Sequence, residues 1–228
     1  MMPPPQDVWV VIAAYNEAKV IADVVADVRR DHYRVVVVDD GSKDRTADLA
    51  AQAGAMVIRH PINLGQGAAL QTALDFALAE GAAFIVTFDA DGQHRAADIP
   101  ALVEALGARK ADFALGSRFL GTAVNLPARR RALLRAAVVF TRLTTGLSIT
   151  DSHNGLRAMT RRGAEAIHLR QNRMAHASEI LHQIATSGLP YVETPVTIHY
   201  SAYSLAKGQS LMDALLIILD LFARRLHR

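Results

Sequence analysis

The sequence predicts an α/β fold: a mostly parallel, Rossmann-like central sheet covered by helices on both faces. Short apolar runs alternate along the first half of the chain with segments that have helical spacing. Continuous apolar runs are typical of strands buried on both faces, and their alternation with helices favours parallel pairing. The expected strands are residues 8–13, 34–39, 55–59, 83–89 and 112–117. The expected helices between them are residues 17–30, 43–53, 66–80 and 96–108.

The second half of the chain has a less regular pattern. Helical spacing recurs at residues 128–145, 175–187 and 209–224, and strand patterns occur at residues 156–159 and 191–200. Neither a repeat nor a linker divides the 228 residues, a length that one domain accommodates. We therefore expect a single domain.

The composition indicates a globular protein that works without cysteine chemistry. Hydrophobic residues make up 51% of the chain, and the absence of cysteine excludes disulfides and thiolate metal sites. The start lacks the basic and apolar segments of a secretory signal, and no apolar run is long enough to span a bilayer. We therefore expect a cytoplasmic protein.

The two halves of the chain carry opposite charge. Residues 1–110 hold 10 Lys and Arg against 15 Asp and Glu, whereas residues 111–228 hold 15 against 7. This predicts that the first half handles cations and the second half meets anions such as phosphates or anionic lipids, with solvated arginines as the alternative. Nucleic acid is not expected, because only 6% of residues are aromatic and the first half is acidic.

Polar turns follow the first two expected strands. Tyr15-Asn16-Glu17 follows the first, and a turn that begins Asp39-Asp40-Gly41 and continues to Asp44 follows the second. Acidic residues at such turns bind ribose in dinucleotide folds, although Asp44 alternatively caps the next helix. On adjacent strands, the two turns together predict a nucleotide site.

A glycine-containing turn precedes the expected helix 66–80. Gly65 and Gly67 allow the backbone to approach a ligand closely. A dehydrogenase fingerprint does not fit, because these glycines do not follow the first strand and Leu70 stands where its third glycine would be.

The clearest chemical signal is the run Asp89-Ala90-Asp91-Gly92-Gln93-His94 after the fourth expected strand. Two carboxylates one residue apart can address one hard cation, and the Gln93 side chain offers a third oxygen. Oxygen ligands of this kind suit Mg²⁺ or Mn²⁺ bridging to substrate phosphates.

At this point the sequence resembles the inverting glycosyltransferases of family 2, most closely the dolichyl- and polyprenyl-phosphate sugar synthases. The shared motifs are, in order, Tyr15-Asn16-Glu17, the Asp39–Thr46 segment, Asn63–Gly67, Asp89–His94, Gly116-Ser117-Arg118 and Asp151–Arg157. The resemblance covers about residues 8–210 and implies a GT-A fold. It also implies a nucleotide-sugar half over about residues 8–118, an acceptor half over about 119–208 and a terminal helix over about 209–228.

The resemblance assigns roles to individual residues. The expected contacts to a GDP- or UDP-sugar are Ala13, Tyr15, Glu17, Asp39, Asp40, Gly65, Gly67, Asp89, Ala90 and Arg118, and the expected metal ligands are Asp89, Asp91 and Gln93. The expected catalytic residues are Asp91, Asp151, Glu179 and Arg118, and the expected acceptor or phosphate contacts are Arg118, Arg131 and Lys207. Past Tyr200 the basic cluster of the family is reduced to Lys207, which separates this chain from the pattern.

Two helices leave alternatives open. The terminal helix 209–224 has a broad apolar stripe and ends in arginines, so it lies on the inner face of a membrane, packs on the core or forms a homodimer contact. His176, Glu179 and His182 are spaced three apart, which drifts around a helix, and they are not expected to bind zinc.

The expected reaction moves a sugar, with inversion, from the nucleotide to a polyprenyl phosphate. A lipid phosphate needs no general base, whereas a sugar hydroxyl in glycan or lipopolysaccharide synthesis would need a carboxylate such as Asp151 or Glu179. The hydroxyl acceptor remains the main alternative. A catalytically inactive nucleotide-sugar-binding protein is disfavoured because the acidic pair and the glycine turns are intact.

Overall fold

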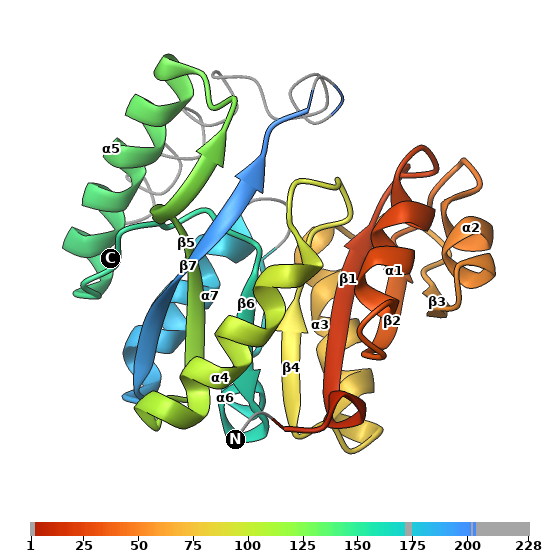
Figure 1. Cartoon of the computed structure of the whole chain (residues 1–228), viewed down its shortest axis with the longest axis horizontal. Helices are drawn as coiled ribbons and strands as arrows, with labels where there is room; N and C mark the ends of the chain where they lie inside the picture. The colour runs from red at the N-terminus through yellow and green to blue at the C-terminus, as the bar shows by residue number, and fades with distance from the viewer. Residues whose placement is uncertain (1–2, 172–174, 202, 204–228) are drawn as a thin grey trace.

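The computed structural model describes residues 3–171, 175–201 and 203, and these form a seven-stranded sheet flanked by helices (Figure 1). The strands are β1 Val8–Ala14, β2 Arg34–Asp39, β3 Met56–Arg59, β4 Phe84–Thr87, β5 Phe113–Val124, β6 Arg157–Thr160 and β7 Tyr191–His199. The α-helices are α1 Ile21–Arg29, α2 Thr46–Gln52, α3 Gln66–Ala79, α4 Ile99–Arg109, α5 Ala128–Thr145, α6 Arg161–Glu165 and α7 Ala175–Ser187. Short 3₁₀ turns occupy Pro5–Asp7 and Ala96–Asp98.

The sheet has the strand order β3-β2-β1-β4-β6-β5-β7 and is mostly parallel, as the sequence predicts. Strand β6 is the exception, because it runs antiparallel to both β4 and β5. Its first residue, Arg157, pairs with Thr87, the last residue of β4. The chain therefore enters β6 from the edge where β4 ends, and this brings the preceding segment 151–156 to that edge.

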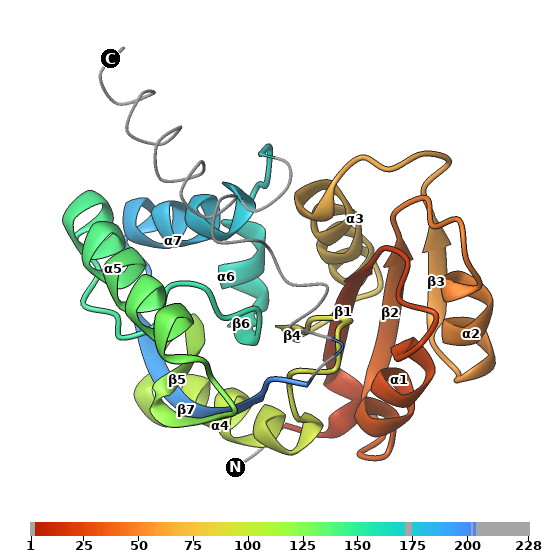
Figure 2. The same ribbon diagram turned by 90° about the horizontal axis from the view of Figure 1, so that it is seen from above.

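Helices cover both faces of the sheet (Figure 2). Alternate β1 side chains point to opposite faces, so Val10 packs with α1, α2 and α4, whereas Val11 packs with α3, α6 and α7. The predicted double cover is thus confirmed, and it explains why the strands read as continuous apolar runs. Helix α5 lies beside α7 at the end of the sheet.

Helix boundaries differ from the predictions mainly at the polar turns. Helices α1 and α2 begin three to four residues later than expected, at Ile21 and Thr46. The reason is that the two preceding turns bond to each other: Glu17 N donates to Thr46 Oγ1 at 2.7 Å, and Lys43 N donates to Asn16 Oδ1 at 2.9 Å. Helices α5 and α7 have the predicted bounds.

Two further features concern the second half. Strand β5 continues past its predicted end to Val124, with a break in its pairing with β7 between Ser117 and Thr122. Within the described ranges, no helix has the length and hydropathy needed to cross a bilayer. Lys207 and the predicted helix 209–224 lie outside the described residues.

Candidate active site

The carboxyl ends of β1, β2 and β4 meet at one edge of the sheet, and the polar turns of the sequence gather there (Figure 1). Parallel strands bring this about, because Ala14 at the end of β1 pairs with Asp39 at the end of β2. Asp44 ties the turns together by accepting hydrogen bonds from Ala18 N and Thr46 N, at 3.2 and 3.0 Å. Ligands of open α/β sheets bind at such an edge.

The neighbouring carboxylates Asp39 and Asp40 have different surroundings. Asp40 accepts hydrogen bonds from Leu64 N and Gly65 N at 2.9 and 2.8 Å and contacts His60 Nδ1 at 2.9 Å, so its oxygens hold the turn before α3. Asp39 is buried, and its Oδ1 has no hydrogen-bond partner among the described residues. A buried acceptor without a partner is costly unless a ligand supplies the donor.

The two glycines of the third turn serve different purposes. Gly65 has a φ of 98°, which strains any residue with a side chain. Gly67 is instead a packing position, because a Cβ there would lie 2.1 Å from the carbonyl oxygen of Gln171 and 3.0 Å from His176 Cβ. Gly67 thus lets α3 approach the start of α7.

The acidic pair follows β4 at the same edge. Asp89 Oδ2 lies 2.9 Å from His94 Nε2, and Asp91 Oδ1 accepts a hydrogen bond of 3.0 Å from Gln93 N. The Gln93 carbonyl in turn accepts a bond of 2.9 Å from His199 N at the end of β7. Both ends of the loop are therefore fixed, and its two carboxylates are near enough for their charges to interact.

The pKa values of the two carboxylates are shifted in opposite directions. Burial raises the pKa of Asp91 to about 6, and the negative charge of Asp89 adds to the increase. Burial also acts to raise the pKa of Asp89, but the hydrogen bond from His94 and nearby positive charges outweigh it, so the pKa of Asp89 lies below its usual range. Their mutual repulsion is the situation that a divalent cation relieves.

The donor set fits Mg²⁺ or Mn²⁺ bound through oxygen. In the part of the chain that the structure describes, no three His, Cys, Asp or Glu side chains gather as a metal centre. Two carboxylates and the Gln93 amide would leave positions open for phosphate oxygens and water. Mg²⁺ is commonly held in this way, through one or two carboxylates plus substrate phosphates.

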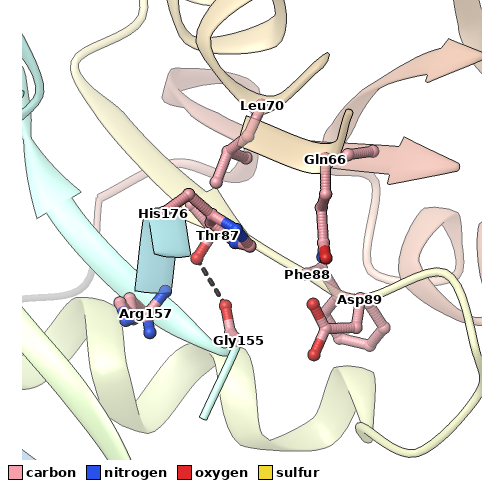
Figure 3. A pocket seen from close by; sticks show the side chains of 9 residues that line it. Gln66, Leu70, Thr87, Phe88, Asp89, Gly155, Arg157 and His176 are labelled. Atoms are coloured by element: carbon pink, nitrogen blue, oxygen red, sulfur yellow. Dashed lines mark hydrogen bonds between the residues drawn. The ribbon is translucent and has the colours of Figure 1, made fainter. Parts of the chain in front are cut away.

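A small pocket opens beside Asp89 (Figure 3). Its lining residues are Ala13, Gln66, Leu70, Thr87, Phe88, Asp89, Gly155, Arg157 and His176. Thr87 Oγ1 donates a hydrogen bond of 2.5 Å to the Gly155 carbonyl, which fixes the entry into β6. A Cβ at Gly155 would lie 2.1 Å from Asp89 Oδ2, so only glycine fits there.

A second charged cluster lies where β5 ends its regular pairing. The buried Arg118 guanidinium donates from Nε to Asp151 Oδ2 at 2.6 Å, and its other nitrogens donate to Tyr200 Oη and the His153 carbonyl. Burial acts to lower the pKa of Arg118, but the charge and hydrogen bond of Asp151 raise it overall. Glu193 Oε1 holds Asp151 from behind by accepting from its backbone N–H at 3.2 Å.

Comparisons with known proteins identify the family and the fold. A family model described as glycosyl transferase family 2 matches residues 9–167. The chain belongs to this family. This confirms the resemblance carried by the ordered motifs, and with it the prediction of a glycosyltransferase enzyme.

Two relatives of this glycosyltransferase have named acceptors. It is 31% identical over 227 residues to UDP-N-acetylglucosamine–dolichyl-phosphate N-acetylglucosaminyltransferase of Methanococcus voltae, with 90% of each chain covered. It is 30% identical over 227 residues to polyprenol monophosphomannose synthase of Mycolicibacterium smegmatis, with 93% of this chain and 85% of the relative covered.

The glycosyltransferase also resembles a solved structure. It superposes with a TM-score of 0.71 and 20% identity on glucosyl-3-phosphoglycerate synthase of Mycobacterium tuberculosis, crystallised with Mn²⁺, UDP-glucose and phosphoglyceric acid. The match covers 95% of this chain and 79% of the other. At this identity it establishes the fold, and the predicted GT-A architecture is confirmed.

The expected donor-side residues of the glycosyltransferase lie together, with different exposures. Tyr15 is exposed, and Glu17 is buried and accepts a hydrogen bond of 2.8 Å from Tyr203 Oη at its Oε2. Ala13 lines the pocket beside Asp89, whereas the Ala90 side chain packs in the core. Ala90 thus places its neighbours but presents no side chain to a ligand.

The expected acceptor-side residues are more scattered. Asp151 is fully buried, and its oxygens accept bonds from Arg118, from Asn154 and from the His153 backbone. Glu179 on α7 accepts bonds of 2.9–3.1 Å from the backbone N–H groups of Arg170 and Gln171, a structural task. Arg131 is exposed on α5.

Several contacts at the site were not among the sequence predictions. Tyr200 and Tyr203 follow β7 at the edge where β5 and β7 run parallel, and Glu193 lies within β7. A signal was present only for Tyr203, because polar residues after an expected strand predict an edge position. Tyr200 and Glu193 fell within the expected strand 191–200. His94 was noted only as part of a motif.

Proposed function

We propose that this enzyme transfers a sugar from a nucleotide-sugar donor to a polyprenyl phosphate, with Mg²⁺ or Mn²⁺ and inversion at the anomeric carbon. One observation carries the proposal: two features occur at the same sheet edge. One is the acidic Asp89–Asp91 loop, and the other is the buried Asp39 carboxylate, whose Oδ1 has no hydrogen-bond partner among the described residues. A nucleoside diphosphate has the matching parts: N–H or O–H donors on the nucleoside and a diphosphate that binds a cation.

The donor would extend from the turns of β1 and β2 to the loop after β4. Asp39 Oδ1 is suited to accept a hydrogen bond from the base or ribose, and the exposed ring of Tyr15 is suited to flank the base. Asp40 would act indirectly, because its oxygens hold the turn before α3. Gly65 directly precedes α3, and the amino terminus of this helix would then lie close to the phosphates.

Asp89, Asp91 and Gln93 would hold the cation. When bound, the cation stabilises the negative charge that develops on the leaving nucleoside diphosphate. The protein's own contribution is to fix these ligands through His94, through the Gln93–His199 backbone bond and through the close backbone of Gly155. Attack on the face opposite the diphosphate then inverts the anomeric centre.

Two observations support a phosphate acceptor over a hydroxyl acceptor. A hydroxyl needs a base, yet Asp151 is enclosed by Arg118 and Glu179 is bonded to backbone amides. A lipid phosphate is already ionised at neutral pH and needs none. The two relatives named above have dolichyl and polyprenyl acceptors in their names, at about 30% identity.

Helix α5 supports the lipid character of the acceptor. It carries five arginines and no acidic residue, and Val139 and Leu143 are exposed, Leu143 by 77%. Basic and apolar side chains on one helix suit a phosphate that is attached to an isoprenoid chain at an anionic membrane surface. Arg131 at its start would be the phosphate contact, and Arg118 would orient the cluster behind it. Peripheral attachment at the inner membrane face follows from the same features.

Transfer to a hydroxyl or other small acceptor remains the second candidate. The solved relative acts, by its name, in making glucosyl-3-phosphoglycerate, so the fold also accommodates a non-lipid acceptor. The acceptor that becomes labelled separates the two.

The test has two stages. A thermal-shift screen of GDP- and UDP-sugars with Mn²⁺ identifies the donor, because a ligand that binds the native state raises its apparent stability. The radiolabelled donor is then incubated with polyprenyl phosphate in detergent micelles or with soluble saccharides. We expect label in the organic phase only when both Mn²⁺ and the lipid are present. Full activity in EDTA would refute the metal assignment, and label on saccharides alone would refute the acceptor.

A further inference from the structure

His94 occupies a position that metal coordination by itself does not explain. Its side chain is 3% exposed, and Nε2 lies 2.9 Å from Asp89 Oδ2. Its ring packs edge-on against Phe88, with centroids 5.4 Å apart. The other ring nitrogen, Nδ1, is buried without a hydrogen-bond partner among the described residues.

This geometry fixes which nitrogen of His94 carries the proton. Asp89 Oδ2 accepts, so Nε2 must donate for the 2.9 Å contact to be a hydrogen bond. A proton on Nδ1 would leave a buried N–H with no acceptor among the described residues, which costs more than an unpaired lone pair. The contact geometry therefore places a proton on His94 Nε2.

Asp89 is held from the opposite side by the backbone of Gly155. A Cβ at Gly155 would lie 2.1 and 2.2 Å from the two Asp89 oxygens, which shows how closely the backbone approaches the carboxylate. His94 and Gly155 together leave Asp89 little freedom to rotate. With Oδ2 bonded to His94, Oδ1 accepts no hydrogen bond from the described residues and is the oxygen that can turn to a ligand.

We propose that His94 is a positioning residue: its Nε2–H holds Asp89 Oδ2 so that the carboxylate is aimed at the divalent cation, an assignment that rests on the proposed function. Carboxylate ligands are commonly oriented by such outer contacts, whose removal weakens metal affinity by about 10- to 100-fold. The competing explanation is that His94 merely fills space against Phe88.

Two substitutions separate the explanations. In His94→Gln the side-chain amide nitrogen reaches the place of Nε2, and in His94→Asn it stands nearer the place of Nδ1. The first keeps a donor for Asp89 and the second does not, although both remove the ring. A packing role would make both variants alike, whereas a positioning role predicts rescue by Gln alone.

The measurement is Mn²⁺ affinity of the free protein, read from the electron paramagnetic resonance signal of unbound Mn²⁺. We expect His94→Asn to bind at least about 10-fold more weakly than wild type, and His94→Gln to bind within about 3-fold of it. His60→Asn is the matched control, because His60 is a half-buried histidine that also contacts an aspartate, Asp40, away from the cation loop. Its Mn²⁺ affinity should equal that of wild type.

The outcomes also distinguish failure of this inference from failure of the metal assignment. Wild-type affinity in His94→Asn, with loss of binding in Asp91→Ala, would overturn the role of His94 and leave the metal site intact. Equal weakening in both His94 variants would likewise overturn it, in favour of packing. Unchanged binding in Asp91→Ala would overturn the metal site itself.

A second measurement needs no variant. Long-range ¹H–¹⁵N spectra of the wild-type protein report which nitrogen of each histidine is protonated. We expect a proton on Nε2 of His94, with and without Mg²⁺. An Nδ1–H tautomer would overturn the inference, because Nε2 could then donate nothing to Asp89.

Discussion

The sheet edge of this glycosyltransferase carries two charged clusters that differ in how far their hydrogen-bonding groups are occupied. In the donor cluster, Asp39 Oδ1 has no partner among the described residues, and the negative charge of Asp89 raises the pKa of Asp91. In the cluster around Arg118, the guanidinium donates to Asp151, Tyr200 and a backbone carbonyl. The donor cluster therefore has an acceptor that a ligand could satisfy, whereas the Arg118 guanidinium already has its hydrogen-bond acceptors within the protein.

The difference has a physical consequence for what each cluster does. Unpaired buried acceptors and repelling carboxylates reduce stability in the free protein, and a cation or a hydrogen-bond donor relieves the cost on binding. The buried Arg118–Asp151 ion pair, in contrast, holds the local structure in place. We therefore expect substitutions in the donor cluster to act on binding and catalysis, and substitutions around Arg118 to act first on stability.

The largest effect is expected from Asp91→Ala. Loss of one of two carboxylate ligands, together with the charge that the cation would neutralise, should lower kcat/KM for transfer by at least about 1000-fold, or about 4 kcal/mol. Stability should be unchanged or increased, because removing Asp91 ends its repulsion with Asp89. Transfer kinetics and denaturant unfolding of the same protein measure both quantities.

The same variant tests the comparison itself. A large loss of stability in Asp91→Ala, with activity falling only in proportion to unfolded protein, would mean that the donor cluster is as structural as the other one. Retained transfer would mean that Asp91 is not a metal ligand.

Arg118→Met should give the opposite result. It leaves the buried Asp151 carboxylate without its partner, which costs about 3–5 kcal/mol in unfolding free energy for a buried pair. Arg30→Met is the control, because the Arg30–Asp27 pair is exposed and should contribute less than about 1 kcal/mol. Chemical denaturation measures both. Mn²⁺ affinity at temperatures where Arg118→Met remains folded should stay near wild type.

An Arg118→Met protein that is as stable as wild type but inactive would break the comparison. Arg118 would then meet the ligand directly, as the family resemblance suggested, and its present partners would exchange for phosphate during the reaction.

The pH dependence of stability should also come from the Arg118 cluster. Burial lowers the pKa of His153 to about 4, against the usual 6.5 of the unfolded chain. Above pH 7 the residue is neutral in both states and has no effect. As the pH falls below 6.5, the unfolded state gains a proton that the folded state refuses, so the free energy of unfolding drops by about 2 kcal/mol between about pH 7.5 and pH 5.

His153→Gln should remove that part of the dependence. Unfolding by denaturant at both pH values measures the difference between wild type and variant, and carboxylates common to both proteins cancel. Parallel pH profiles for the two proteins would show that the pKa of His153 is not lowered in the folded state.

Local features of the site could be predicted from the sequence, and distant partners could not. The Asp89–Asp91 pair and its edge position follow from a short motif after an apolar run. The different roles of Asp39 and Asp40 could not be predicted from the sequence. The backbone N–H groups that donate to Asp40 belong to Leu64 and Gly65, about 25 residues away. The direction of β6 and the Arg118–Tyr200 contact, 82 residues apart, depend on the path of the whole second half.

The smallest effects are expected at the start of α5, where one of two neighbouring arginines contacts the Arg118 cluster and the other is exposed. Arg130 lies over the Tyr200 ring at 5.1 Å and so belongs to the cluster around Arg118, whereas Arg131 is exposed. Arg130→Met should lower the free energy of unfolding by about 0.5–1 kcal/mol through loss of the cation–π contact. Arg131→Met should change stability by less than about 0.5 kcal/mol.

Acceptor kinetics separate the two arginines further. Arg131→Met should raise the KM for polyprenyl phosphate several-fold, with an effect that shrinks as salt is added, because an exposed charge is screened. The KM for the donor should not change. If Arg130→Met alone raises the acceptor KM, the phosphate is bound on the Tyr200 side of the helix. The cluster around Arg118 would then bind the acceptor as well as hold the local structure.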